Sequence, residues 1–136
     1  FKSYSQSNII ITGDFNDSPF DESFTHHLMA KTNFTTINRN ALYNLSYSLA
    51  KNGIGSNKYQ GKWELIDQFI VSGSLLLNEG LHTNENTFRV FKAPFLLEKD
   101  KNYLGDKPFR TYTGFKYNNG FSDHLPIVFD LDKSSN

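Results

Sequence analysis

The chain has 136 residues, enough for one modest domain. Its 14 basic and 14 acidic residues cancel, which argues against a dedicated binder of nucleic-acid duplexes, because such proteins usually carry a basic excess. The absence of cysteine excludes disulfides and thiolate metal sites, and no apolar run approaches the roughly 18 residues of a membrane span. The chain starts at Phe1 and its only methionine is Met29, so we expect a processed form or a fragment.

The first half of the chain predicts one buried strand and two helices. Residues 8–12 are a run rich in β-branched side chains, which is typical of a central strand buried on both faces. Apolar residues at near-helical spacing predict a helix over about residues 20–30, and leucines at similar spacing predict a second one within 41–50. The three glycines of residues 52–62 predict a loop.

The second half predicts strands separated by loops. Residues 63–71 read as a strand in which Asp67 shares one face with apolar side chains. A short strand is expected at 87–91 and a second buried strand at 126–131, with a turn or helix at 72–77, a charged loop at 98–107 and a flexible tail at 133–136. These elements favour a mixed α/β (α+β) fold with strands in the core and helices on one face.

Asp14 and Asn16 follow the first predicted strand, where catalytic side chains of α/β proteins are common. The carboxylate could orient or deprotonate a water, and the amide could donate a hydrogen bond to a phosphate oxygen. The alternative is an ordinary Asx turn after a strand.

Asp67 and His124 form a second candidate group. A carboxylate in an apolar row needs a partner, and a histidine at a strand end could be that partner, held in one tautomer by the acid. The alternative for Asp67 is a strand cap or an ion pair with a lysine. Adjacent side chains usually point apart, so we expect Asp123 not to orient His124 and to be free to act as a hard oxygen ligand for Mg²⁺ or Mn²⁺.

Other chemistries find little support. Nucleotide-binding, dinucleotide-binding, serine-hydrolase and zincin motifs are all missing from the sequence. His26 and His27 lie in a predicted helix with only Glu22 at ligand spacing, which is a generic helical pair.

Three ordered motifs resemble the endonuclease/exonuclease/phosphatase family: Ile-Thr-Gly-Asp-Phe-Asn, Ile-Asp-Gln-Phe-Ile-Val-Ser and Ser-Asp-His-Leu-Pro-Ile. The resemblance is greatest to bacterial members that have Arg-Thr-Tyr before a glycine-rich turn, as this chain has at residues 110–112 and 119–121. The resemblance implies that residues 1–132 are the C-terminal half of the domain. That half would be part of a four-layer α/β/β/α sandwich, with a mixed, mostly antiparallel sheet.

By the same resemblance, Asp14 would position or activate the attacking water and Asn16 would bind the phosphate. Asp67 would orient His124, which would act at the scissile phosphate, and Asp123 would contribute to the metal site. The family's N-terminal half supplies a Mg²⁺-binding glutamate, so we expect that half as a partner. Gln68 stands where many relatives have a tyrosine.

The resulting hypothesis is a phosphoesterase (nuclease- or phosphatase-like) that depends on Mg²⁺ or Mn²⁺ and hydrolyses a phosphodiester or phosphomonoester with activated water. We expect the chain alone to be inactive. Whether the substrate is nucleic acid, lipid or a small molecule stays open. The alternative is a non-catalytic module of the same fold that binds a phosphate ligand or acts as a scaffold.

Overall fold

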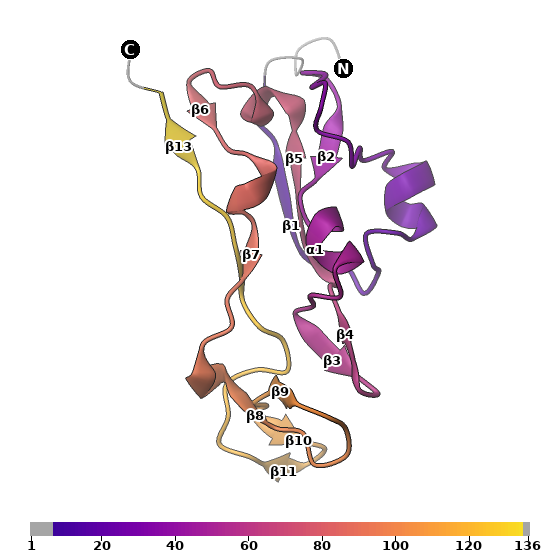
Figure 1. The fold of residues 1–136 in the computed structure, drawn as a ribbon, viewed down its shortest axis with the longest axis vertical. Coiled ribbons are helices and arrows are strands. Elements are labelled where there is room, and N and C mark those ends of the chain that lie inside the picture. Colours follow the sequence, from indigo (N-terminus) through magenta and orange to yellow (C-terminus); the bar gives the residue numbers. More distant parts are fainter. Residues whose placement is uncertain (1–6, 135–136) are drawn as a thin grey trace.

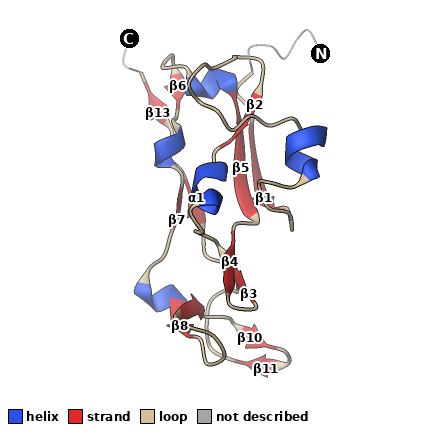
Figure 2. Ribbon diagram, turned by 45° about the vertical axis from the view of Figure 1, so that its right-hand side comes forward, coloured by secondary structure: helices blue, strands red, loops and turns tan. Residues whose placement is uncertain are grey.

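The computed structural model describes residues 7–134, which form a mixed α+β fold with mostly antiparallel strand pairs and a few short helices (Figures 1 and 2). This confirms the predicted fold class. No helix in the described part of the chain is both long and apolar enough to cross a membrane.

A three-stranded antiparallel sheet lies at the centre, in the order β1 (Ile10–Asp14), β5 (Asp67–Ser72), β2 (Leu42–Asn44). The middle strand, β5, is buried on both faces. Ile70 and Val71 are both inaccessible to solvent, and neighbouring side chains of a strand point to opposite faces.

The core consists of two clusters on opposite sides of β5. Ile70 packs with Phe24 and Ala30 on one side. On the other side, Val71 joins a larger cluster of buried apolar residues: Tyr43, Leu45, Leu65, Leu75 and Phe88. Strand β5 is therefore the element that both halves of the core share.

In residues 7–134 the strand expected at 8–12 begins at Ile10 and lies at the edge of the sheet, not at its centre. Among residues 7–134, β1 pairs only with β5, and Ile9 and Ile10 remain 38% and 42% exposed. A continuous apolar run suits either a central or an edge strand, because it does not say how many neighbours the strand has.

Both predicted helices are shorter than expected. Residues 20–30 contain only a π-helical turn, Ser23–His27, and the backbone turns left-handed at Met29, with φ at 53°. Residues 41–50 hold β2 and then α1 (Tyr47–Lys51). Two of the leucines with helical spacing pack on opposite sides of the sheet: Leu42 contacts the cluster around Ile70, and Leu45 belongs to the cluster around Val71.

A hairpin interrupts the long strand predicted at residues 63–71. It comprises β3 (Asn57–Tyr59), inside the expected loop, and β4 (Lys62–Glu64), and residues 65–66 separate β4 from β5. Its two turn residues, Gln60 and Gly61, both have positive φ, at 46° and 83°. That is the backbone of the tight turn that matches strand twist.

The rest of the chain forms short antiparallel pairs and turns. The pairs are β6 (Leu81–His82) with β13 (Asp132–Lys133), β7 (Arg89–Val90) with β12 (Ile127–Val128), β8 (Leu97–Lys99) with β9 (Asp106–Pro108), and β10 (Tyr112–Thr113) with β11 (Lys116–Tyr117). The 3₁₀ turns are Gly73–Leu76, Glu85–Thr87 and Pro94–Leu96. Strands β8 to β11 gather at the end of the molecule away from the central sheet (Figure 1).

These pairs differ from the sequence expectations in three places. The loop expected at 98–107 contains parts of β8 and β9, and the buried strand expected at 126–131 is the partly buried two-residue β12. Lys133, the first residue of the expected tail, lies in β13, and the last two residues lie outside the described part.

A buried ion pair connects the β3–β4 hairpin to the β8–β9 loop. The ammonium of Lys58, whose side chain is 1% exposed, lies 3.1 Å from Asp100 Oδ2. It also donates to the carbonyls of Leu104 and Asp106, at 2.8 and 3.2 Å. Three acceptors satisfy this buried ammonium, which fixes one strand of the hairpin.

Candidate functional site

Two carboxylates face each other where β1 ends and β5 begins. The antiparallel register places Asp14 directly opposite Asp67. Asp14 is exposed, whereas the Asp67 side chain is only 15% exposed. Because Asp14 ends β1 and Asp67 begins β5, the pairing of these strands brings together two acids that are far apart in sequence.

His124 joins the two acids from the far end of the chain. Its Nδ1 lies 2.8 Å from Asp67 Oδ2. One ligand atom each from Asp14, Asp67 and His124 all lie within 4.8 Å of one another. The contact expected between Asp67 and His124 is thus present.

Strand β3 and the residue before it complete this arrangement. The Ser56 hydroxyl, on a fully buried residue, donates to Asp67 Oδ2. Asn57 Nδ2 lies 3.0 Å from His124 Nε2. A β-bridge between Asn57 and His124, with the Leu125 N–H donating to the Ser56 carbonyl at 2.8 Å, fixes the backbone here.

Sequence reasoning missed Ser56 and Asn57. Both are uncharged and stand in a glycine-rich segment that reads as a loop. The one available signal is Gly55: a Cβ there would come within 2.4 Å of the Glu64 backbone nitrogen, so the strands approach too closely for a side chain.

Asn16 lies at the rim of the same strand end. Its backbone has a left-handed φ of 52°, and its N–H donates to Asp14 Oδ1 at 2.9 Å. This is the Asx turn considered above. Asn16 also lines a cavity of about 340 Å³ that extends to Phe20 and Trp63, whereas Asp14, Asp67 and His124 are not among its lining residues.

Asp123 and Gln68 have different surroundings. Asp123 is exposed and is not a member of the acid–histidine group formed within residues 7–134. Gln68 is fully buried. Its amide donates to the Asp17 carbonyl and accepts from Asn44 Nδ2, both at 2.6 Å. The buried Gln68 side chain therefore connects β5 to β2 and to the turn at Asp17, and it is not exposed at the site.

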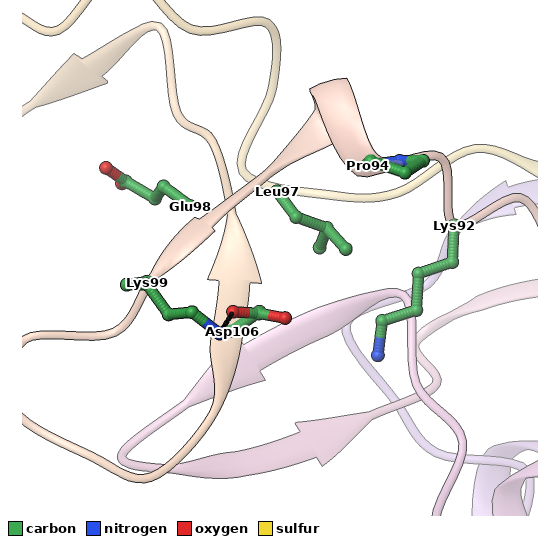
Figure 3. Close-up of a pocket in the computed structure, with 6 residues that line it drawn as sticks. All are labelled: Lys92, Pro94, Leu97, Glu98, Lys99 and Asp106. Carbon is green, nitrogen blue, oxygen red and sulfur yellow. Dashed lines mark ion pairs between the residues drawn. The ribbon is translucent and has the colours of Figure 1, made fainter.

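A separate hollow lies between β8, β9 and the segment before them. Figure 3 shows its lining: Lys92, Pro94, Leu97, Glu98, Lys99 and Asp106. The hydrogen bond from Lys99, 2.7 Å away, lowers the pKa of Asp106 below its ordinary value. The Lys92 ammonium lies 4.3 Å from the centre of the Trp63 ring. None of the side chains proposed from the sequence lines this hollow.

The donor set at the acid–histidine group suits a hard cation only in part. Asp14 offers an exposed carboxylate oxygen of the kind that Mg²⁺ takes. Asp67 Oδ2 and both nitrogens of His124 already have hydrogen-bond partners. The described residues can thus supply part of a magnesium coordination shell, and the rest must come from water or from other groups.

The site is a carboxylate-bound imidazole beside a second, exposed carboxylate, set at strand ends of an α+β fold, an arrangement suited to acid–base chemistry. Comparison with known sequences narrows the class. Residues 2–133 match the profile of the Endonuclease/Exonuclease/phosphatase family, and the chain belongs to that family. Its members hydrolyse phosphoester bonds. No curated protein and no solved structure matches the chain.

Proposed function

We propose that this chain is the C-terminal half of a divalent-metal-dependent phosphoesterase that hydrolyses a phosphodiester or phosphomonoester with activated water. The observation that carries the proposal is the convergence of Asp14, Asp67 and His124 within 4.8 Å. A carboxylate and a carboxylate-bound imidazole that meet at one rim have the geometry that general acid–base chemistry at a bound substrate requires.

Each residue has a distinct role. The exposed carboxylate of Asp14 positions and deprotonates the attacking water, and Asn16 donates to a phosphate oxygen. Asp67 accepts the Nδ1–H of His124 and so fixes the ring. His124 serves at the scissile phosphate as a base or as a stabiliser of developing charge.

The cofactor we propose is Mg²⁺, or Mn²⁺ in its place. The family resemblance assigns Asp123, which is exposed, to the metal site, and Asp14 would offer a further exposed carboxylate oxygen; in residues 7–134 Asp123 lies outside the group that Asp14 forms with Asp67 and His124. When bound, such an ion neutralises charge on the phosphate and on the leaving oxygen.

The N-terminal half of the domain is the proposed partner. Strand β1 is the edge of the described sheet and keeps Ile9 and Ile10 partly exposed. An apolar edge of this kind favours a neighbouring strand. We propose that the N-terminal half covers it and brings further metal ligands, so the chain alone would be inactive and prone to aggregate.

The test uses the complete domain with and without Mg²⁺, and p-nitrophenyl phosphate and bis(p-nitrophenyl) phosphate as generic substrates. Asp14→Ala and His124→Ala should each lower kcat by roughly 10²–10⁴-fold, the usual contribution of a general base or acid. The matched controls are Asp132→Ala and His27→Ala, which change an exposed acid and an exposed histidine and should retain activity.

A complete domain that binds phosphate but never hydrolyses either substrate with Mg²⁺ or Mn²⁺ would contradict the proposal and favour a non-catalytic phosphate-binding module. Full activity in both Asp14→Ala and His124→Ala would remove the residue assignments.

A further inference from the structure

Asn57 contacts the one ring nitrogen of His124 that Asp67 leaves free. Its Nδ2 lies 3.0 Å from His124 Nε2, while Nδ1 faces Asp67 on the other side of the ring. The imidazole is therefore held between two side chains from separate strands.

The hydrogen-bond roles at the two ring nitrogens agree with each other. A carboxylate only accepts, so the hydrogen of the ring lies on Nδ1, which donates to Asp67. The neutral ring then has a lone pair on Nε2, and only a donor can satisfy it. The amide nitrogen of Asn57 is such a donor, so Asp67 and Asn57 select the same tautomer.

The side-chain amide of Asn57 makes no other hydrogen bond with the described residues. Its Oδ1 is buried and accepts no hydrogen bond from the described residues. The ring contact is the side-chain hydrogen bond that the structure records for Asn57. Among the described residues, this contact with His124 is therefore the hydrogen bond that orients the amide.

Contacts on both sides fix the backbone around Asn57. Asn57 and His124 form a β-bridge, and the next residue, Lys58, is locked by its buried pair with Asp100. A side chain on such a segment holds a neighbouring ring more accurately than one on a mobile loop.

We propose, taking the proposed function as its basis, that Asn57 is a positioning residue for His124. Before substrate binds, it holds the ring in the orientation and the Nδ1–H tautomer that the reaction uses. Because Nε2 is the nitrogen left to face a phosphoryl group, the incoming substrate displaces the Asn57 amide from it.

The first test is spectroscopic and does not depend on activity. In the complete domain, labelled with ¹⁵N and freed of metal by a chelator, His124 should show a protonated Nδ1 and an unprotonated Nε2 at neutral pH. The resonances are assigned by their loss in His124→Gln. A hydrogen found on Nε2 in the unsubstituted protein overturns the proposal without any variant of Asn57.

Two variants extend this test. Asn57→Ala should shift the Nε2 resonance, because its lone pair loses the amide donor, while Asp67 keeps the hydrogen on Nδ1. The isosteric Asn57→Asp, which replaces the donor by an acceptor, should draw a hydrogen onto Nε2. Asn86→Ala, at an exposed asparagine, is the control and should leave the pattern unchanged. An unaltered ¹⁵N pattern in both Asn57 variants overturns the proposal.

Kinetics separate positioning from a general loss of structure. With bis(p-nitrophenyl) phosphate and Mg²⁺, Asn57→Ala should lower kcat/KM by a few-fold, because without the amide only part of the molecules hold the His124 ring in the orientation that binds substrate. The loss should lie in KM, with kcat changed less than about twofold, because once substrate has taken the place of the amide the two enzymes hold the ring alike. An equal fall in kcat contradicts positioning before binding. If the unsubstituted domain shows no hydrolysis while the ¹⁵N pattern is as expected, the proposed function fails and the Asn57 contact stands.

Discussion

His124 and Asp67 are 57 positions apart in the chain, yet Nδ1 of the imidazole lies 2.8 Å from Oδ2 of the carboxylate. The acid begins β5, the middle strand of the central sheet, and the histidine directly precedes the buried Leu125. Since both residues are attached to parts of the core, their contact is set by the fold and not by the flexibility of a loop.

Asp67→Asn should abolish most of the activity without unfolding the protein. The amide has nearly the same shape, but it can donate to Nδ1 and so favours the wrong ring tautomer. We expect kcat to fall on the order of 10⁴-fold, as when the acid of other acid–histidine pairs is changed in this way. Asp130→Asn, at an exposed acid paired with Arg89, should keep kcat. Near-normal turnover by Asp67→Asn contradicts the role of Asp67.

Ser56→Ala should have a smaller effect than Asp67→Asn. It removes the hydroxyl that donates to Asp67 Oδ2 and leaves that oxygen with one donor fewer. The expected loss in the free energy of unfolding is about 1 kcal/mol, the usual net contribution of one hydrogen bond. Urea denaturation measures it, with Ser48→Ala as the exposed control. A variant as stable as the control shows that this bond contributes nothing to the fold.

The core between the sheet and the 3₁₀ turn after it can be tested at Leu75, which is fully buried. Leu75→Ala should lower the free energy of unfolding by about 2–5 kcal/mol, since it removes buried methyl groups and leaves a cavity. Leu104→Ala is the matched control, because Leu104 is 97% exposed, and should change it by less than about 0.5 kcal/mol. Similar losses in both variants contradict the described packing.

Because the ion pair of Lys58 and Asp100 is buried, its loss should lower the thermal midpoint more than the loss of an exposed ion pair. Lys58→Met removes the ammonium and leaves a buried carboxylate without its counter-ion. Lys99→Met breaks the pair with Asp106, but the Lys99 side chain is 85% exposed and water replaces what is lost. The thermal midpoint should fall clearly in Lys58→Met and hardly change in Lys99→Met.

Acid should destabilise the protein through the same loop. The pKa of Asp100 is below its ordinary value, first because the Asn102 N–H donates to the carboxylate and then because Lys58 lies beside it. Asp106 is lowered in the same direction by Lys99. As the pH falls past the ordinary pKa of 3.8, these two carboxylates take up protons in the unfolded chain before they do so in the folded protein. The stability that the two charged groups contribute is therefore complete above that pH and is lost as the pH falls through the lowered pKa values of the folded state.

Thermal unfolding between about pH 6 and pH 2 measures this contribution, since carboxylates titrate in that range. The midpoint of the unsubstituted protein should fall more steeply at the acid end than that of Asp100→Asn, which already lacks the charge. Parallel curves for the two proteins would contradict the assignment.

The sequence predicts the acids and the histidine of the site because charged residues at the ends of apolar runs are conspicuous. Asp14, Asp67 and His124 each adjoin such a run, and the fold class also follows from the alternation of elements. The contact between Asp67 and His124 could be anticipated because an acid in an apolar row needs a partner.

The remaining features depend on tertiary pairing. Leucines at 42, 45 and 49 match a helix locally, yet the pairing of Tyr43 with Val71 places the first of them in a strand. Asn57 is an uncharged residue in a glycine-rich segment, and only its bridge to His124 reveals its place in the site. Local pattern carries no information about such distant neighbours.

Strand β3 presents two successive side chains to two different neighbours, Asn57 to the imidazole of His124 and Lys58 to the carboxylate of Asp100. Inserting or deleting a single residue just before this pair would reverse which way each side chain points. A cation would then press against the imidazole and an amide would replace the counter-ion of Asp100. The length of this hairpin should therefore tolerate less variation than its exposed turn would imply.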